Sequence, residues 1–200
     1  HNIINASIEK NGKKKLTIKR GNKVFEEEFD YIINTTYGNH NQLSHWLNFR
    51  VKPIRIDLVE ALVIKLPIPK ISLAVMDGPF TNLVPINRSN RFTLVHIKES
   101  ILQRYVPKDG LPYKNVIPQS RAKEIMDKSK EWIPILSKAK IIESRYVFRA
   151  VNAYREFDDA RPSDITNHGF GCWSILGGKI VNCVSAARKL TKEMFLNSNE

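Results

Sequence analysis

The stretch from Gly169 to Phe195 constrains the fold of this chain most, because a glycine-rich, partly apolar turn runs directly into a helical pattern. After the glycines, apolar residues recur at three- and four-residue spacing: Ile180, Val184, Ala187, Leu190 and Met194. This spacing predicts a helix with one apolar face. Basic residues follow at the far end of the pattern, where the helix dipole favours positive charge.

Gly177 and Gly178 stand where this helix is expected to begin. Two residues without side chains let the backbone approach a ligand closely. The first N–H groups of a helix lack internal partners and carry partial positive charge, which favours a negative or electron-accepting group. A tight loop that merely starts the helix is the alternative, and the turn alone does not separate the two.

Two further stretches belong with this turn. Tyr31-Ile32-Ile33 is a short apolar run of the kind found in buried parallel strands, and it ends in Asn34-Thr35-Thr36-Tyr37-Gly38. Asp159-Ala160-Arg161-Pro162-Ser163 precedes the glycines. In this order, the three stretches resemble motifs of the flavoprotein oxidoreductases of the D-amino-acid oxidase superfamily, which includes flavin-linked glycerol-3-phosphate dehydrogenases. Tyr37 is an insertion relative to the usual Ala-Thr-Gly of that family.

The resemblance implies an enzyme that binds FAD and oxidises a small anionic substrate by hydride transfer to the flavin. It carries over these cofactor-binding residues: Asn34, Thr36, Gly38, Gly171, Ser174, Leu176, Gly177, Gly178 and Lys179. Arg161 is expected near the substrate, where a guanidinium binds a carboxylate or phosphate; an ion pair with Asp158 or Asp159 is the alternative. His96 is the second catalytic candidate, as a substrate-facing base, and its alternative is a satisfied core or edge histidine.

The family's fingerprint for the FAD pyrophosphate, Gly-x-Gly-x-x-Gly after an N-terminal strand, is absent from this sequence. We therefore expect the C-terminal portion of a longer flavoprotein, with the missing N-terminal FAD-binding half as its partner. The expected fold class is α+β, an antiparallel substrate-domain sheet plus the C-terminal part of a Rossmann-like FAD-binding domain. Residues 1–50 and 153–200 are assigned to the FAD-binding domain and residues 51–152 to the substrate domain.

The local patterns predict mainly β-strands. Residues 2–28 combine alternation with turns, as in a β-meander. Further strands are expected over residues 54–66, 72–76, 81–86, 91–97 and 141–151. Tight turns between successive strands predict an antiparallel sheet, from which Glu60 is expected to point outward. Residues 101–117 are expected to be mostly loop, and residues 120–136 a helix that Pro134 ends or kinks.

Composition narrows the functional classes. The net charge is +12, but the cationic residues are not interleaved with aromatics in a stripe, which disfavours nucleic acid as a partner. Lys13-Lys14-Lys15 is expected at a solvated hairpin tip. Cys172 and Cys183 are expected to be small buried residues, because two cysteines make no disulfide framework. They indicate a reducing, cytoplasmic compartment. No metal set accompanies His40 and His45, and no apolar run approaches the roughly 20 residues of a membrane span.

Two other interpretations stay open at this point. A non-catalytic basic module that binds nucleic acid or another anionic ligand would use the positive charge and would need no missing half. A degenerate flavoprotein fragment that has lost its cofactor would account for the absent fingerprint. Both are distinguished from an oxidoreductase by whether the protein binds a flavin.

Overall fold

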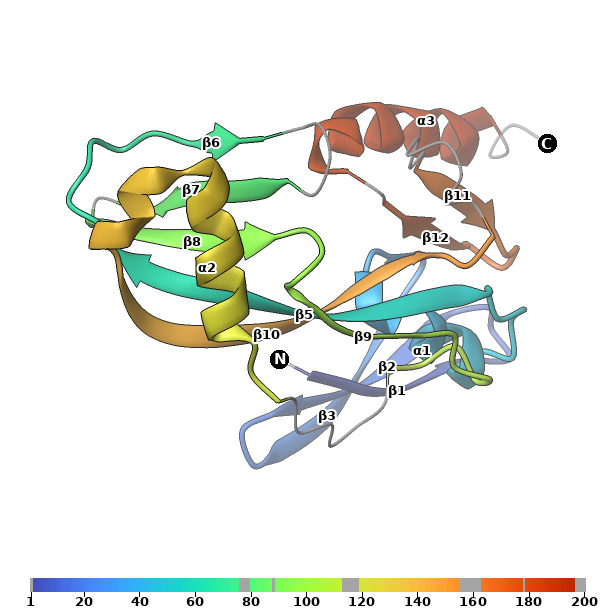
Figure 1. The fold of residues 1–200 in the computed structure, drawn as a ribbon. Helices are drawn as coiled ribbons and strands as arrows, with labels where there is room; N and C mark the ends of the chain where they lie inside the picture. Colours follow the sequence, from blue (N-terminus) through green and yellow to red (C-terminus); the bar gives the residue numbers. More distant parts are fainter. Residues whose placement is uncertain are drawn as a thin grey trace. The chain divides into compact units, whose positions relative to one another are not determined.

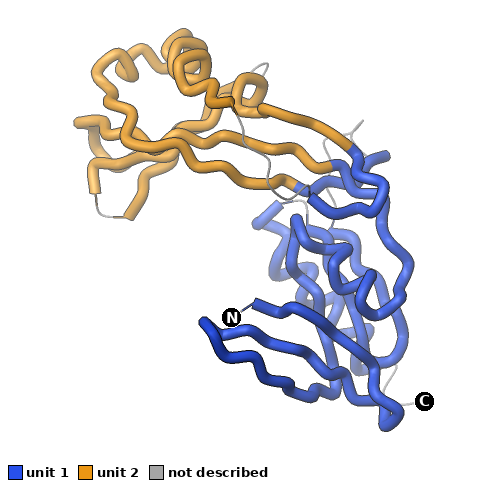
Figure 2. The backbone as a smooth tube through the Cα atoms, turned by 90° about the horizontal axis from the view of Figure 1, so that it is seen from below, with its two compact units in different colours: residues 1–55, 106–112, 150–200 blue, residues 56–105, 113–149 orange. Residues whose placement is uncertain are grey.

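The computed structural model describes residues 2–75, 80–87, 89–112, 119–154, 163–177 and 179–196 (Figure 1). The chain forms two compact units, which Figure 2 shows in different colours. Unit 1 comprises residues 1–55, 106–112 and 150–200, and unit 2 comprises residues 56–105 and 113–149. The fold is α+β with antiparallel sheets, as expected from the sequence. In the described residues, no helix is both long and apolar enough to cross a membrane.

Unit 1 begins with a three-stranded antiparallel sheet, which confirms the predicted meander. Its strands are β1 (Asn2–Ile8), β2 (Lys14–Arg20) and β3 (Lys23–Phe29). The inward residues of these strands pack with α1 (His40–Trp46) and with the second sheet of the unit. The core they form contains Ala6, Leu16, Ile18, Ile32, Leu47 and Cys172.

The Lys13-Lys14-Lys15 run at the start of β2 corrects one expectation. Lys13 and Lys15 pair with exposed or half-buried carboxylates, as a solvated run would. Lys14, in contrast, is buried, and its Nζ donates to the carbonyl of Gly12 at 3.0 Å. The same ammonium lies 5.9 Å from the centre of the Tyr31 ring. Strand alternation turns Lys14 inward, where a carbonyl and an aromatic ring replace water around its charge.

The second sheet of unit 1 contains the parallel strand predicted near Tyr31. Its order is β11 (Asp164–Asn167), β12 (Cys172–Leu176) and β4 (Ile32–Asn34), with β12 parallel to β4 and antiparallel to β11. The expectation that the glycine-rich stretch after Gly169 is a turn running directly into a helix is therefore wrong, because the apolar run inside it is β12. A short apolar run bounded by glycines is equally a pattern of a buried strand, and pairing with β4 decides between the two.

The C-terminal helix begins slightly later than predicted. A 3₁₀ turn at Ile180–Asn182 precedes α3 (Cys183–Leu196), which lies beside β11 and β12 (Figure 1). The predicted apolar face is confirmed for Leu190, which is buried together with Ala186. Ile180 and Val184 of the predicted apolar pattern are 84% and 58% exposed. The helix thus presents a second apolar surface that no described residue covers.

Unit 2 is built on the antiparallel sheet that the sequence predicts. Its strands are β5 (Ile54–Lys65), β6 (Leu73–Ala74), β7 (Thr81–Ile86), β8 (Arg91–His96), β9 (Ile101–Tyr105) and β10 (Lys140–Asn152). The order is β10-β5-β8-β7-β6, with β9 also paired to β5. β9 corrects the expectation of loop over residues 101–117. The prolines and the glycine that suggested a loop all lie after Tyr105, so they do not interrupt the strand.

One helix covers one face of this sheet. Figure 1 shows α2 (Ala122–Trp132) lying across β5, β7 and β8. A 3₁₀ segment, Pro134–Lys138, follows the helix, so Pro134 confirms the predicted end. The core between helix and sheet contains Leu62, Ile64, Leu66, Leu83, Phe92, Leu94, Ile125, Met126, Ile133 and Leu136.

Glu60 does not point outward as expected but is fully buried at the start of α2. Its carboxylate accepts hydrogen bonds from the Ser120 hydroxyl at 2.6 Å and the Arg121 N–H at 2.7 Å. A third comes from the Ser144 hydroxyl on β10 at 2.5 Å. A carboxylate at a helix N-terminus satisfies free N–H groups and interacts favourably with the helix dipole. Glu60 therefore fixes α2 and β10 to β5.

We expect Glu60→Ala to lower the free energy of unfolding by about 3 kcal/mol, because it leaves three donors of unit 2 without their acceptor. The control is Glu131→Ala, which removes only an exposed pair with Lys128 and should change stability by less than about 0.5 kcal/mol. Urea unfolding of the two variants measures the difference. Equal losses would show that Glu60 has no special structural role.

Candidate functional site

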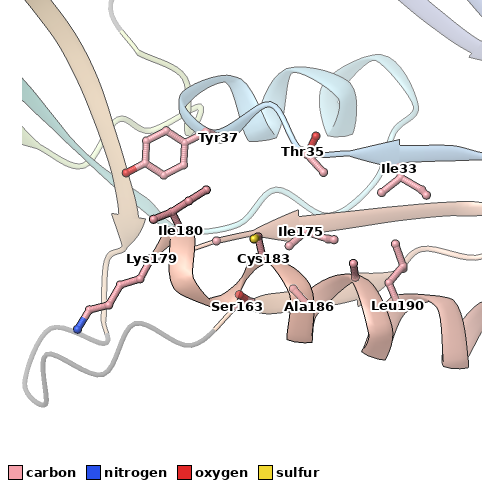
Figure 3. A pocket seen from close by; sticks show the side chains of 12 residues that line it. Ile33, Thr35, Tyr37, Ser163, Ile175, Lys179, Ile180, Cys183, Ala186 and Leu190 are labelled. Atoms are coloured by element: carbon pink, nitrogen blue, oxygen red, sulfur yellow. The ribbon is translucent and has the colours of Figure 1, made fainter. Parts of the chain in front are cut away.

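A cleft of about 560 Å³ lies in unit 1, between the β12–β4 sheet and α3 (Figure 3). Its lining consists of Ile33, Thr35, Tyr37, Ser163, Ile175, Gly177, Lys179, Ile180, Cys183, Ala186, Ala187 and Leu190. Thr35 and Gly177 directly follow the carboxyl ends of β4 and β12, which are parallel. Ligands of parallel sheets bind at this edge, because the loops that follow neighbouring strands begin there and leave a crevice between them.

The turn after β4 is held in shape by Asn34. This buried side chain donates from Nδ2 to the His40 carbonyl at 2.7 Å. Its Oδ1 accepts from the backbone N–H and the hydroxyl of Thr36, at 3.1 and 2.8 Å. Tyr37, next in the turn, has a φ of 51°, a left-handed conformation that non-glycine residues seldom adopt. The hydrogen bonds of Asn34 thus order a turn that presents Thr35 and Tyr37 to the cleft.

The opposite wall of the cleft is formed by α3 and the residues before it. Lys179 has extended backbone, and Figure 3 shows its side chain directed away from the apolar side chains of the cleft. Ile180, Ala186 and Leu190 supply apolar surface. Cys183 also lines the cleft and is exposed, so the expectation that both cysteines are buried holds for Cys172 and is wrong for Cys183.

The lining of the cleft is mainly apolar, with a few polar and titratable side chains. Its described members include no histidine or carboxylate, and their titratable side chains are those of Tyr37, Lys179 and Cys183. Most of the surface is apolar, with hydroxyl and ammonium groups at Thr35, Ser163 and Lys179. Such a cleft suits a flat, largely apolar group that brings its own reactivity.

The structure brings together part of the residues proposed to bind the cofactor. Gly177 and Lys179 line the cleft. Asn34, Thr36 and Gly38 belong to the turn after β4 but do not line the cleft. Their neighbours Thr35 and Tyr37 line it. The sequence located the turn, but the backbone conformation of the turn, with its 3₁₀ segment from Tyr37, decides which side chains enter the cleft.

The other proposed residues lie elsewhere. Ser174 and Leu176 are buried on the face of β12 opposite Ile175. Gly171 stands at the amino end of β12, and a Cβ there would approach the Asp30 carbonyl to 2.8 Å, so packing alone accounts for the glycine. Gly178 and the proposed catalytic Arg161 lie outside the described residues.

His96 is buried in unit 2. Its Nδ1 accepts the N–H of Glu99 at 3.2 Å, and its own backbone N–H donates to the Ser100 hydroxyl at 3.1 Å. Burial lowers the pKa of the imidazole. These contacts order the turn between β8 and β9, and a role as base for His96 stays a prediction.

Two histidines of unit 1 that sequence reasoning did not connect are the half-buried His168 and the buried His40. His168 stacks on Phe49 with 4.6 Å between ring centres, and its Nε2 is 2.8 Å from the Ser174 hydroxyl. His40 is fully buried, and neither ring nitrogen has a hydrogen-bond partner within the described part of the chain. Burial, and then the positive charge of Lys52, lower the pKa of His40 to about 4. His40 and His168 are far apart in the sequence, so no local pattern indicates that they lie in the same unit.

We expect unit 1 to lose stability as the pH falls from about 6.5 to 4. An unfolded histidine has a pKa of about 6.5, so in this window the unfolded chain binds a proton that folded His40 excludes. The contribution is complete above pH 6.5, and at pH 4 about 3 kcal/mol of it is lost. Denaturant unfolding at pH 7 and 4.5 measures this, and His168 shifts in the same direction.

His40→Gln should reduce this dependence on pH, because the titrating group is gone. His45→Gln removes an exposed histidine of the same helix and serves as the control. An unchanged slope in His40→Gln would contradict the assignment.

Comparisons with known proteins place the fold. No protein-family model matches the chain, and no curated protein matches it. Among solved structures, glycerol-3-phosphate dehydrogenase from Bacillus halodurans, determined in complex with FAD, matches with a TM-score of 0.64 at 14% identity. That match covers 99% of this chain and 38% of the dehydrogenase.

Two oxidases match similarly. Iminodiacetate oxidase from Chelativorans sp. BNC1 has 15% identity and glycine oxidase from Geobacillus kaustophilus 11%, each with a TM-score of 0.58 over 88% of this chain. The matches cover 44% and 42% of the oxidases. This chain has the fold of one part of these oxidases and dehydrogenases. The likeness inferred from three short motifs is therefore confirmed for the fold, and the chain spans less than half the length of the structures it matches.

Proposed function

We propose that this chain is part of an FAD-dependent oxidoreductase that oxidises a small amine or alcohol bearing a carboxylate or phosphate. The observation that carries the proposal is the apolar cleft at the carboxyl ends of parallel β4 and β12. It occurs in a fold shared with a glycerol-3-phosphate dehydrogenase determined with FAD.

The residues of the cleft fit a flavin. Its volume of about 560 Å³ is in the usual range for sites of cofactor size. A Cβ at Gly177 would meet nothing within 4 Å, so a ring can approach this backbone. Ile33, Ile175 and Ile180 offer apolar contact to the ring, and Thr35 and Ser163 offer hydroxyl groups to its polar edge.

Within this proposal, the flavin supplies the hydride acceptor when it is bound. Asn34 keeps the turn after β4 in place, and thereby orders Thr35 and Tyr37 against the bound ring. Lys179 and the first turn before α3 add positive potential at one end of the cleft, which favours electron-rich atoms. The apolar walls exclude water from the ring.

We further propose that unit 1 is the C-terminal part of a Rossmann-like FAD-binding domain and unit 2 the substrate domain. Parallel pairing of β4 and β12 supports the first assignment, and the antiparallel sheet under α2 supports the second. β4 ends its sheet among the described strands. An N-terminal half that carries the pyrophosphate fingerprint is the proposed partner for that edge and for the exposed apolar surface of α3.

The absorbance spectrum of the full natural polypeptide that carries this chain tests the proposal. Bound oxidised flavin is expected to give bands at roughly 370 and 450 nm. A spectrum without these bands, even after incubation with FAD, would overturn the proposal. Salt-dependent binding of nucleic acid would then favour a basic binding module.

Cys183→Trp should lower the affinity for FAD about tenfold or more, because an indole at this position fills the cleft. The matched control is Ser185→Trp, two residues along α3, which is exposed and is not part of the lining. Fluorescence titration with FAD measures both affinities. If Cys183→Trp binds FAD as the unmodified protein does, the flavin site lies elsewhere.

A further inference from the structure

Two arginines of unit 2 share one buried carboxylate. Asp57 on β5 is fully buried. Arg104 on β9 donates from Nε to Oδ1 at 3.2 Å, and Arg149 on β10 donates from Nε to Oδ2 at 3.0 Å. Arg149 also donates to Oδ2 from Nη2. Since β9 and β10 both pair with β5, the carboxylate is contacted from two neighbouring strands.

This trio lies on the sheet face that α2 does not cover. Arg104 is directly opposite Asp57 in the β5–β9 register, so both side chains are on the same face. Leu62 and Ile64 of the same strand pack against α2 in the core cluster. Strand alternation places Asp57 on the other face from these two residues. The side chain of Arg104 is 48% exposed.

The charges and donors of the trio do not balance. Within the described ranges of the chain, two guanidinium groups contact this one carboxylate, so these three side chains together carry one net positive charge. A guanidinium has about five N–H donors, and the contacts among the described residues engage only Nε of Arg104 and one face of Arg149. Neutralising Asp57 requires one arginine, and buried ion pairs are weak sources of stability. The second arginine therefore calls for another explanation.

We propose that Arg104 and Arg149 form a binding site for an oxyanion, the carboxylate or phosphate of a small molecule, with Asp57 as the positioning residue. Asp57 accepts from both Nε groups and so fixes the two planar guanidiniums before the ligand arrives. The remaining N–H groups match carboxylate and phosphate oxygens with parallel hydrogen bonds. The inference rests on the proposed function only for the identity of the molecule that carries the anion.

The test is a titration of the full natural polypeptide with inorganic phosphate and, separately, with sodium acetate, at constant ionic strength set by chloride. Binding is followed by the NMR signals of the arginine Nε–H groups. We expect a saturable shift of the Arg104 signal. Tighter binding of phosphate than of acetate assigns the site to phosphate groups, and the reverse order assigns it to carboxylates.

Arg104→Gln should weaken this binding about tenfold or more, since it removes a charge-assisted contact. Arg145→Gln is the matched control, because it makes the same change of charge on β10 at a 57% exposed side chain paired with Glu143. It should leave the affinity within about twofold. Equal losses in both variants would reduce the effect to diffuse positive charge, and the absence of a saturable shift would make the trio a structural ion pair. Either result overturns the inference.

The outcomes for the two proposals are separable. Saturable anion binding by a protein without flavin bands supports the oxyanion site and overturns the proposed oxidoreductase. Flavin bands without saturable anion binding support the proposed oxidoreductase and overturn the oxyanion site.

Discussion

The parallel pairing of β4 with β12 is the contact on which the rest of unit 1 depends. It joins Ile32 to Cys172 and Asn34 to Ser174, residues that are far apart in the sequence. Because the strands are parallel, β4 and β12 end at the same edge of the sheet. The turn after β4 therefore lies beside the glycine turn after β12. The cleft exists only because of this meeting. The same pairing also brings His168 near the buried His40 on the other face of the sheet.

Unit 2 depends in a comparable way on two carboxylates of a single strand. Glu60 and Asp57 lie on opposite faces of β5, as their odd spacing dictates. Glu60 is satisfied by hydroxyls and a helix N–H, and it connects the sheet to α2. Asp57 accepts hydrogen bonds from two guanidinium groups on the face that α2 does not cover. One strand therefore carries a structural anion on one side and a candidate recognition element on the other.

Much of the fold could be predicted from local pattern, because most elements here have the periodicity of their type. β7 and the meander follow alternation, and α2 and α3 follow the helical spacing. Part of the candidate site could also be predicted, since the Asn34–Gly38 turn and Gly177 stand at strand ends that the sequence marks. The misplaced elements, β9 and β12, are short runs that strand and turn patterns describe equally well, and only pairing with β5 and β4 makes them strands.

The sequence by itself determined the strands of the antiparallel sheet and the apolar helix after the glycines, because these are properties of neighbouring residues. It also determined the order of the three motifs along the chain, because that order is read directly from the sequence. Tertiary structure decided which side chains are buried and which are brought together. Glu60 points inward because three donors from two other segments, residues 120–121 and β10, meet it. Cys183 faces a cleft because α3 leaves one apolar side uncovered. Contacts of this kind join residues that are distant in the sequence, so no local period records them.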